Sequence, residues 1–228
     1  MTRLAAVLAL VFAAPLHADD KPVEPFNGKD TTGWKFKGDA KKSKWVAGAA
    51  ALDEKKPDAL AVSEAKSLPE LVNAKPGSVD IFTEEKFGSM HLELEFMIPK
   101  GSNSGVYMMG EYEVQIYDTH GKTPPKIGDM ASIYTYAAPK VDASKKHGEW
   151  QKLVIDFEAP KFEGEKKVSN AKFVKVTFNG TVIHENVECT KGVTPGGLTG
   201  KEAATGPLMF QGDHGAVSFR NIKITPKK

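Results

Sequence analysis

The residues of this chain best suited to chemistry lie between Gly101 and Gly121, where two carboxylates and an amide accompany one short apolar strand. Side chains alternate along a strand, so Glu113 and Gln115 share one face while the two aliphatic residues that follow them take the other. In a regular strand Asp118 falls on the aliphatic face, and a one-residue bulge would swing it beside Glu113. Two acids held together in this way could act as general base and general acid.

The same pattern has a structural interpretation, because half-exposed strands carry Glu and Gln on their wet face for solubility alone. The flanking segments favour function. Asn103 lies in a Ser-Asn-Ser-Gly segment before the strand, and Asp118 opens an Asp-Thr-His-Gly segment after it. Loops at strand ends are where binding and catalytic residues concentrate. We therefore interpret the region as a candidate site.

Composition bounds the class of protein. The 228 residues suffice for one all-β domain, and 31 basic against 29 acidic residues give a net charge of +2. No basic run alternates with aromatic residues, so a nucleic-acid partner is not expected. Cys189 is the single cysteine, which excludes an intrachain disulfide.

The N-terminus predicts export. Arg3 precedes an apolar run over Leu4–Leu16, and a small-residue site ends at Ala18. We expect a signal peptide over residues 1–18, cleaved after Ala18, and a secreted or periplasmic protein. The apolar run is too short to span a membrane. A tail over 19–25 and one domain over 26–228 complete the predicted organisation.

Period-two alternation predicts about ten short strands and no sustained helix, which indicates an all-β sandwich or jelly roll. The clearest strand is His91–Ile98, and Asn179-Gly180 predicts a tight hairpin turn that leaves His184 on the wet face. One or two helical turns are expected within Ala65–Asn73, and Glu188–Gly206 is expected to be a long functional or flexible loop. The other expected strands are Trp45–Leu52, Ala59–Val62, Val106–Met109, Tyr112–Tyr117, Ser132–Ala137, Trp150–Glu158, Pro207–Gln211 and Ala216–Thr225.

Several segments, taken together and in order, resemble the bacterial 3-keto-disaccharide hydrolase family over about Phe26 to Thr225. They are Phe26–Asp30, Gly33-Trp34, Asn103–Tyr107, Tyr112–Asp118, Gly148–Trp150, Asn179-Gly180, Gly206–Leu208, Phe210–Gly215 and Phe219–Ile222. The resemblance implies a concanavalin A-like β-sandwich of two antiparallel sheets, with a carbohydrate site on the concave face of a sheet. Two departures stand out: Gly212 is an extra residue in the family's Leu-Gln-Asp-His-Gly segment, and Ser132–Thr135 replaces a Gly-containing turn.

The spacing E-x-Q-x-x-D is also similar to the E-x-D-x-x-E motif of laminarinase-type β-glucanases. In those enzymes two carboxylates flank the glycosidic bond. Here Gln115 replaces the middle Asp and the shorter Asp118 replaces the last Glu, which weakens the case for that mechanism.

The resemblance implies cleavage of 3-keto-glycosides, in which a C3 ketone acidifies the C2 proton, a base removes it, the C1 group leaves and water adds. Glu113 and Asp118 are the candidate base and acid, with His214 as an alternative proton carrier because histidine titrates near neutrality. Each of three candidates also has a structural interpretation. Arg220 could pair with an acid, His214 could be a turn residue, and Tyr107 could pack in the core. The candidate substrate-binding residues are Asn103, Tyr107, Gln115, Gln211, Asp213 and Arg220.

Two questions stay open at the level of sequence. A divalent metal held by Glu113, Asp213 and His214 would suit this chemistry, although no ligand spacing is diagnostic. A non-catalytic, lectin-like sandwich would present the same polar face to a glycan without cleaving it. The sequence fixes neither the sugar nor the oligomeric state.

Overall fold

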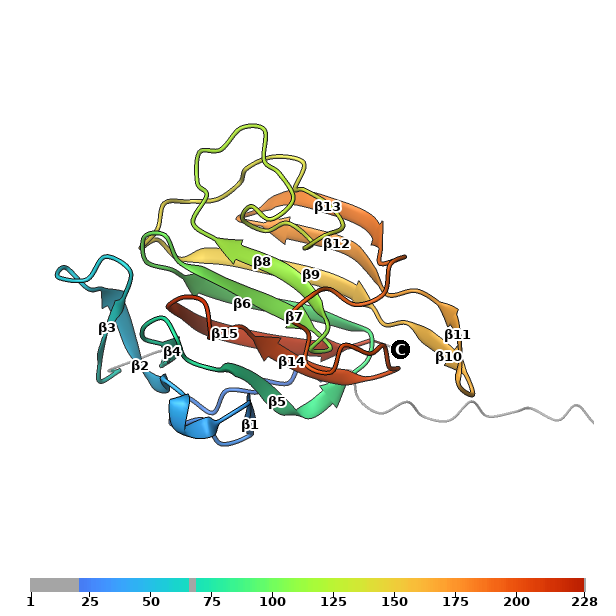
Figure 1. Cartoon of the computed structure of the whole chain (residues 1–228), viewed down its shortest axis with the longest axis horizontal. Helices are drawn as coiled ribbons and strands as arrows, with labels where there is room; N and C mark the ends of the chain where they lie inside the picture. Colours follow the sequence, from blue (N-terminus) through green and yellow to red (C-terminus); the bar gives the residue numbers. More distant parts are fainter. Residues whose placement is uncertain (1–20, 66–68, 228) are drawn as a thin grey trace, which may run out of the picture.

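Two antiparallel sheets stack face to face in the computed structural model, which describes residues 21–65 and 69–227 (Figure 1). The predicted signal peptide over residues 1–18 lies outside this range. A three-residue 3-10 turn, Ala40–Lys42, is the only helix in the described part of the chain. None of the helical structure there is long and apolar enough to cross a membrane. The expected all-β, concanavalin-like sandwich is confirmed.

The smaller sheet has five strands in the order β1-β5-β14-β7-β8. It joins segments far apart in the sequence, because β14 lies between β5 and β7. The strands are β1 (Trp34–Lys37), β5 (Asp80–Phe87), β7 (Asn103–Met108), β8 (Tyr112–Tyr117) and β14 (Gly206–Phe210).

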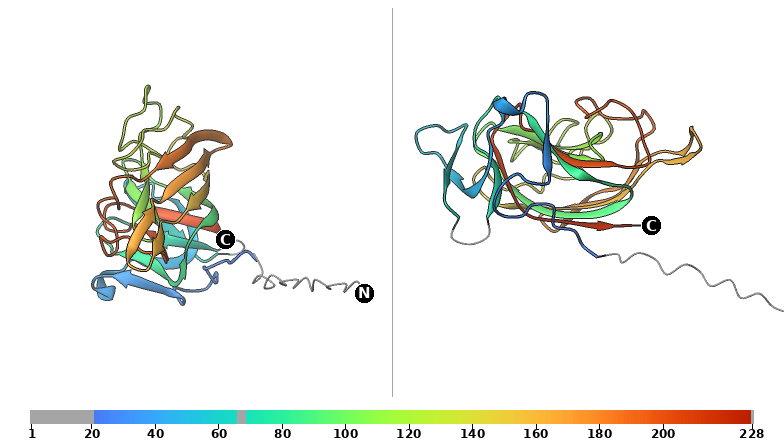
Figure 2. Two further views of the ribbon diagram at one scale, coloured as in Figure 1. Left: turned by 90° about the vertical axis from the view of Figure 1, so that its right-hand side faces the viewer. Right: turned by 90° about the horizontal axis from the view of Figure 1, so that it is seen from below.

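The larger sheet has eight strands in the order β13-β12-β9-β6-β15-β4-β2-β3, and a separate hairpin, β10-β11, projects beyond the sandwich (Figures 1 and 2). The strands are β2 (Trp45–Leu52), β3 (Leu60–Ser63), β4 (Glu70–Asn73), β6 (Met90–Met97), β9 (Gln151–Glu158), β10 (Lys161–Glu163), β11 (Lys166–Ser169), β12 (Lys172–Phe178), β13 (Thr181–Glu188) and β15 (Val217–Pro226).

Aromatic contacts join the two sheets across the core. Phe210 of β14 stacks on Phe219 of β15 with ring centroids 3.9 Å apart, and Tyr112 of β8 meets Phe157 of β9 at 5.5 Å. Val106 and Val114 are fully buried on the same inner face of the five-stranded sheet. Alternation therefore turns their neighbours to the opposite, outer face of that sheet.

Most of the strongly alternating segments form strands as expected, but two expectations are wrong. Residues 70–73 of the expected helical turn form β4, because this buried segment pairs with β2 on one side and β15 on the other. Ser132–Ala137 is a turn with two isolated bridges at Ile133, and Thr135 there has a φ of 66°. Besides β4, four further strands were not expected: β1, β5, β10 and β11.

The hairpin at Asn179-Gly180 is confirmed, since both residues have positive φ values, 47° and 84°. The expected exposure of His184 is wrong. A bulge next to Val176 shifts the register, so His184 is only 3% exposed and its Nε2 lies 2.8 Å from the Ala131 carbonyl oxygen. Alternation counted outward from the turn fails there because the bulge adds one residue.

Candidate functional site

The outer face of the five-stranded sheet holds the polar residues that the sequence singled out. In the β7–β8 pair Tyr107 lies opposite Glu113 and Gly105 lies opposite Gln115. Because Val106 and Val114 between them point into the core, these four residues point outward.

A cavity of about 180 Å³ opens over this face. The predicted site residues that line it are Asn103, Tyr107, Glu113, Gln115, Gln211 and His214. Tyr134 comes from the turn after β8, and Pro195 and Gly196 come from the long loop after β13. The cavity is smaller than the roughly 300–1,000 Å³ typical of drug-sized ligands, and it suits one sugar ring.

Glu113 is the only carboxylate among the described residues that line the cavity, and it is 3% exposed. The Tyr107 hydroxyl donates to the Pro195 carbonyl at 3.4 Å and lies near the Glu113 carboxylate, where it acts to lower the pKa of that group. In the amide orientation that satisfies both of its ends, Gln115 donates to Glu113 Oε1 at 3.2 Å and to the Ser104 carbonyl at 2.8 Å. Burial outweighs the lowering effect of Tyr107 and raises the pKa of Glu113 to about 8. A carboxyl group with this pKa is well matched to proton transfer near neutral pH.

Three charged residues near Glu113 modify its pKa. Asp80 and Asp213 raise the pKa by repulsion, whereas Lys37 lowers it by attraction. Lys37 Nζ lies 3.3 Å from Asp80 Oδ2 and donates to the Gly196 carbonyl at 2.6 Å. Lys37 therefore both neutralises Asp80 and fixes the loop residue that lines the cavity.

A glycine makes the room that Glu113 occupies. A Cβ atom on Gly105 would lie 2.3 Å from Glu113 Oε1, far inside contact distance. Any side chain at position 105 would displace the Glu113 carboxylate. Gly105, which lies opposite Gln115 in the strand pair, is therefore part of the site.

His214 stands on the turn between β14 and β15, and its Nδ1 lies 2.5 Å from Asp213 Oδ1. The turn packs closely against the start of β7, because a Cβ atom on Gly215 would lie 2.5 Å from the Asn103 carbonyl oxygen. With Nδ1 bonded to Asp213, the free Nε2 of His214 can exchange a proton with a ligand. The extra Gly212 does not remove His214 from the cavity, and its N–H donates to Asp80 Oδ1 at 3.0 Å.

Gln211 has an unused acceptor. Its main chain is held by two bonds, from its own N–H to the Gly105 carbonyl and from the Ser104 hydroxyl to its carbonyl. Its buried side-chain Oε1 has no hydrogen-bond partner among the described residues. A buried polar atom without a partner is costly, so this oxygen is suited to accept a hydrogen bond from a ligand hydroxyl.

Asp118 is not brought to Glu113. The β7–β8 register is regular from one end to the other, and the Asp118 N–H continues it by donating to the Ser102 carbonyl. The Asp118 carboxylate accepts the Gly101 N–H at 2.8 Å and pairs with His147 at 3.4 Å. The bulge that would have turned Asp118 round is absent from this described strand pair.

Arg220 also lies away from the cavity. It is on β15 in the other sheet, opposite Glu95 of β6, and its Nε donates to Glu95 Oε2 at 2.7 Å. Its guanidinium carbon stands 3.9 Å from the ring centroid of Trp150. In this structure Arg220 therefore pairs with an acid, Glu95, and does not line the cavity.

Sequence reasoning did not select Tyr134, Lys37, Asp80 or the loop residues. Tyr134 reaches the cavity because its segment is a turn and not the expected strand. Lys37 and Asp80 lie on β1 and β5, two strands that were not expected. The one available signal was the long Gly- and Pro-rich loop, which supplies Pro195 and Gly196.

Within the described residues, no group of three or more His, Cys, Asp or Glu side chains is placed to hold a metal ion. Glu113, Asp213 and His214 lie in one region, but they do not form a ligand set there. We derive no step through a metal.

Comparisons with known proteins agree with this fold. Residues 21–225 match the family described as the 3-keto-alpha-glucoside-1,2-lyase-like domain. The chain belongs to this family. Membership places it among carbohydrate-active domains. No curated protein sequence matched the chain.

Two crystal structures of candidate glycosyl hydrolases from Parabacteroides distasonis share the fold. The first is 23% identical with a TM-score of 0.66, covering 96% of this chain and 95% of that one. The second is 18% identical with a TM-score of 0.61, covering 91% and 94%. At these identities the likeness concerns the fold alone.

Proposed function

We propose that this protein cleaves the glycosidic bond of 3-keto-glycosides by elimination, with Glu113 as the base. The observation that carries the proposal is one buried carboxylate, its pKa raised to about 8, in a ring-sized cavity that also holds His214. Membership of the lyase-like family supports the same substrate class.

The reaction needs a base for carbon 2, a donor for the ketone and an acid for the leaving oxygen. Glu113 takes the C2 proton, and the electron pair forms an enolate with the C3 ketone. The enolate then collapses, a double bond forms between C1 and C2, and the C1–O bond breaks. The leaving oxygen takes a proton from His214, whose ring is oriented by the contact of its Nδ1 with Asp213 Oδ1 at 2.5 Å. Addition of water across the double bond completes a net hydrolysis.

The remaining side chains bind and orient the sugar. Gln115 is engaged by Glu113 and Ser104, so Asn103 is the better donor to the ketone oxygen. Gln211 Oε1 accepts from a sugar hydroxyl. The Tyr107 hydroxyl stays protonated, because burial and the adjacent Glu113 raise its pKa, and it donates to the Pro195 carbonyl of the loop over the cavity.

The two-carboxylate mechanism of glucanases is less well supported. Asp118 is bonded elsewhere, and Glu113 is the only acid among the described residues lining the cavity. A base and a histidine acid fit elimination, whereas an oxocarbenium route requires a second carboxyl group across the bond.

The test is release of 3-keto-glucose from a panel of 3-keto-glucosides and 3-keto-disaccharides, with unmodified glycosides as controls. Wild type is compared with Glu113→Gln, each with and without a chelator. We expect turnover of keto substrates by wild type, loss in the variant and no effect of the chelator. Saturable sugar binding without turnover by any protein would contradict the proposal and favour a lectin-like module.

We also propose that the protein is exported, on the basis of the leader over residues 1–18. Mass spectrometry of the protein from its native host should give an N-terminus at Asp19. An intact N-terminal Met1 in a protein retained in the cytoplasm would contradict export.

A further inference from the structure

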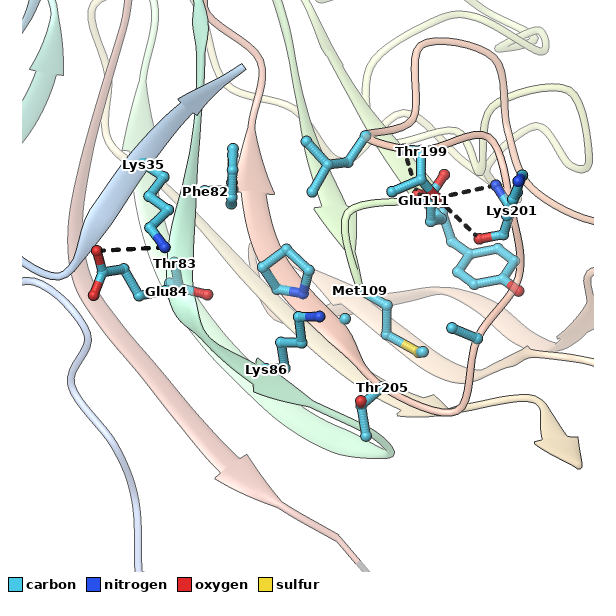
Figure 3. Close-up of a pocket in the computed structure, with 15 residues that line it drawn as sticks. Lys35, Phe82, Thr83, Glu84, Lys86, Met109, Glu111, Thr199, Lys201 and Thr205 are labelled. Carbon is cyan, nitrogen blue, oxygen red and sulfur yellow. Dashed lines mark hydrogen bonds and ion pairs between the residues drawn. The ribbon is translucent and has the colours of Figure 1, made fainter. Parts of the chain in front are cut away.

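A second cavity, of about 290 Å³, lies on the same outer face of the five-stranded sheet and is shown in Figure 3. Tyr107 lines the first cavity, and Met109, two residues further along the chain, lines the second. Two residues of a chain span at most about 7 Å, so the cavities are close neighbours.

The loop after β13 separates the two cavities. Pro195 and Gly196 line the first, whereas Leu198 and Thr199 line the second. The Leu198 N–H donates to the Gly110 carbonyl at 2.7 Å, which fixes the loop against the β7–β8 turn. The second cavity is thus a compartment with its own wall and not an extension of the first.

Glu111 holds this wall in place. Its buried carboxylate accepts the N–H and the hydroxyl of Thr199, at 2.7 and 2.6 Å (Figure 3). It also accepts the N–H of Gly200 at 3.1 Å. These donors satisfy the carboxylate within the protein. Glu111 is therefore a structural acid, and it does not offer a free acceptor to a ligand.

Apolar side chains from four segments form much of the second cavity. Phe82 comes from β5, Met109 from the turn between β7 and β8, Leu198 from the loop and Pro207 from β14. A flat or linear hydrocarbon body can contact all four, and burying it is favourable in proportion to its area.

The charges around the cavity favour an anion. Three lysines line it, and they come from β1, β5 and the loop (Figure 3). Lys35 pairs with Glu84 at 3.8 Å, whereas Lys86 and Lys201 have no ion pair among the described residues. Since Glu111 is already satisfied, the cavity has unpaired positive charge beside an apolar surface.

We propose that this second cavity is a binding site for an organic anion with an apolar body, such as an aromatic carboxylate. The ring contacts Phe82, Met109 and Leu198, and the carboxylate faces Lys86 and Lys201. The proposal does not depend on the reaction assigned to Glu113.

The probe is 2-naphthoate, with neutral 2-naphthamide as its matched control. Binding is measured by calorimetry on the full-length protein, and its place by the NMR shift of the Met109 methyl group, assigned with Met109→Leu. We expect saturable binding of the naphthoate, a shift of that methyl signal, and weaker binding of the amide by about threefold or more.

Two variants and one control locate the site. We expect Phe82→Ala to weaken naphthoate binding about tenfold and Lys86→Gln to weaken it about threefold. Glu113→Gln, in the neighbouring cavity, should leave the affinity unchanged. The exposed Lys86 can be changed without touching the core, so the test stands even if Phe82→Ala folds poorly.

Three results would overturn the proposal: no saturable binding up to the solubility limit, equal binding of acid and amide, or loss of binding in Glu113→Gln with Lys86→Gln unaffected. None of these bears on turnover of keto-glycosides. Failure of the anion site is thus distinguishable from failure of the proposed reaction.

Discussion

Carboxylates line the outer faces of both sheets, and Glu113 on the five-stranded sheet differs from the paired carboxylates of the eight-stranded sheet. On the eight-stranded sheet Glu95 pairs with Arg220 at 2.7 Å, and Asp156 contacts His91 at 2.9 Å and also Lys227. Partial burial acts to raise the pKa of Asp156, but the hydrogen bonds from Lys227 and His91 together outweigh it and hold that pKa below its usual value. On the five-stranded sheet Glu113 has no cation bonded to it in the described structure, and burial raises its pKa to about 8.

The difference comes from what the neighbouring strand supplies. β15 places Arg220 opposite Glu95, whereas β7 places Gly105 and Tyr107 beside Glu113. A basic partner neutralises a strand carboxylate and makes it part of the surface. A glycine and a tyrosine hydroxyl leave the carboxylate buried and reactive. We infer that one sheet face serves stability and the other serves chemistry.

The largest expected effect is loss of activity in Glu113→Gln. A general base contributes about 10²–10⁴-fold to a rate, so kcat/KM for 3-keto-glucosides should fall by that factor. The wild-type value should rise with pH up to about 8, because the base must be ionised. A fall in activity over the same pH range would instead make Glu113 the acid.

The raised pKa of Glu113 should also make the free energy of unfolding depend on pH. Since the folded-state pKa of Glu113 is raised, its contribution is present below about pH 4.5 and is lost as pH rises through about 8. The free energy of unfolding of Glu113→Gln should therefore increase relative to that of wild type as pH rises, by roughly 3–5 kcal/mol.

Urea unfolding at a series of pH values checks this expectation. Asp156→Asn on the other sheet is the opposite control, because the lowered pKa of Asp156 stabilises the fold above its unfolded-state pKa. That variant should lose stability at neutral pH and approach wild type as pH falls. If the stability of both variants relative to wild type changed with pH in the same direction, Glu113 and Asp156 would not differ in the way described above.

His214→Gln and Asp118→Asn test which residue is the acid. We expect His214→Gln to lose about 10²-fold in kcat/KM, because His214 lines the cavity. Asp118→Asn should lose less than about tenfold, because Asp118 bonds Gly101 and His147 outside it. A substrate with a better leaving group should recover activity in His214→Gln alone, and recovery in Asp118→Asn would reverse the assignment.

The sequence predicted what depends on local pattern and missed what depends on pairing. Alternation and the Asn179-Gly180 turn sufficed for the sandwich, and motif residues such as Glu113 and Gln211 do line one cavity. Asp118 was misplaced because a bulge cannot be deduced from one strand alone. Arg220 was misassigned because its partner, Glu95, is 125 residues away along the chain.

The other residues near the site were missed because they lie on polar strands that were not predicted. β1 and β5 carry Lys37 and Asp80 on their outer faces among other charged residues, and this composition weakens the strand signal. The length and composition of the loop predicted a functional or a flexible segment, but its position over Tyr107 follows from bonds such as the one from Lys37 to Gly196. Long-range contacts of this kind leave no mark on local sequence.

A smaller effect is expected for Lys37→Met, with Lys35→Met as the matched control on the same strand face. Removing Lys37 takes a positive charge from Glu113 and leaves Asp80 unpaired, and both changes raise the pKa of Glu113. The rising limb of the pH profile should move upward by about 0.5 pH unit. An equal shift in Lys35→Met, which pairs only with exposed Glu84, would show that the effect is not local.

The smallest expected effect is that of Arg220→Met on activity. The variant loses the bond to Glu95 and the contact with Trp150, and thermal unfolding should show a loss of about 1 kcal/mol. The kcat/KM value should stay within twofold of wild type, because neither residue lines the cavity. A tenfold rise in KM with unchanged stability would make Arg220 a substrate-binding residue. The eight-stranded face would then take part in the chemistry, and the division of labour between the sheets would fail.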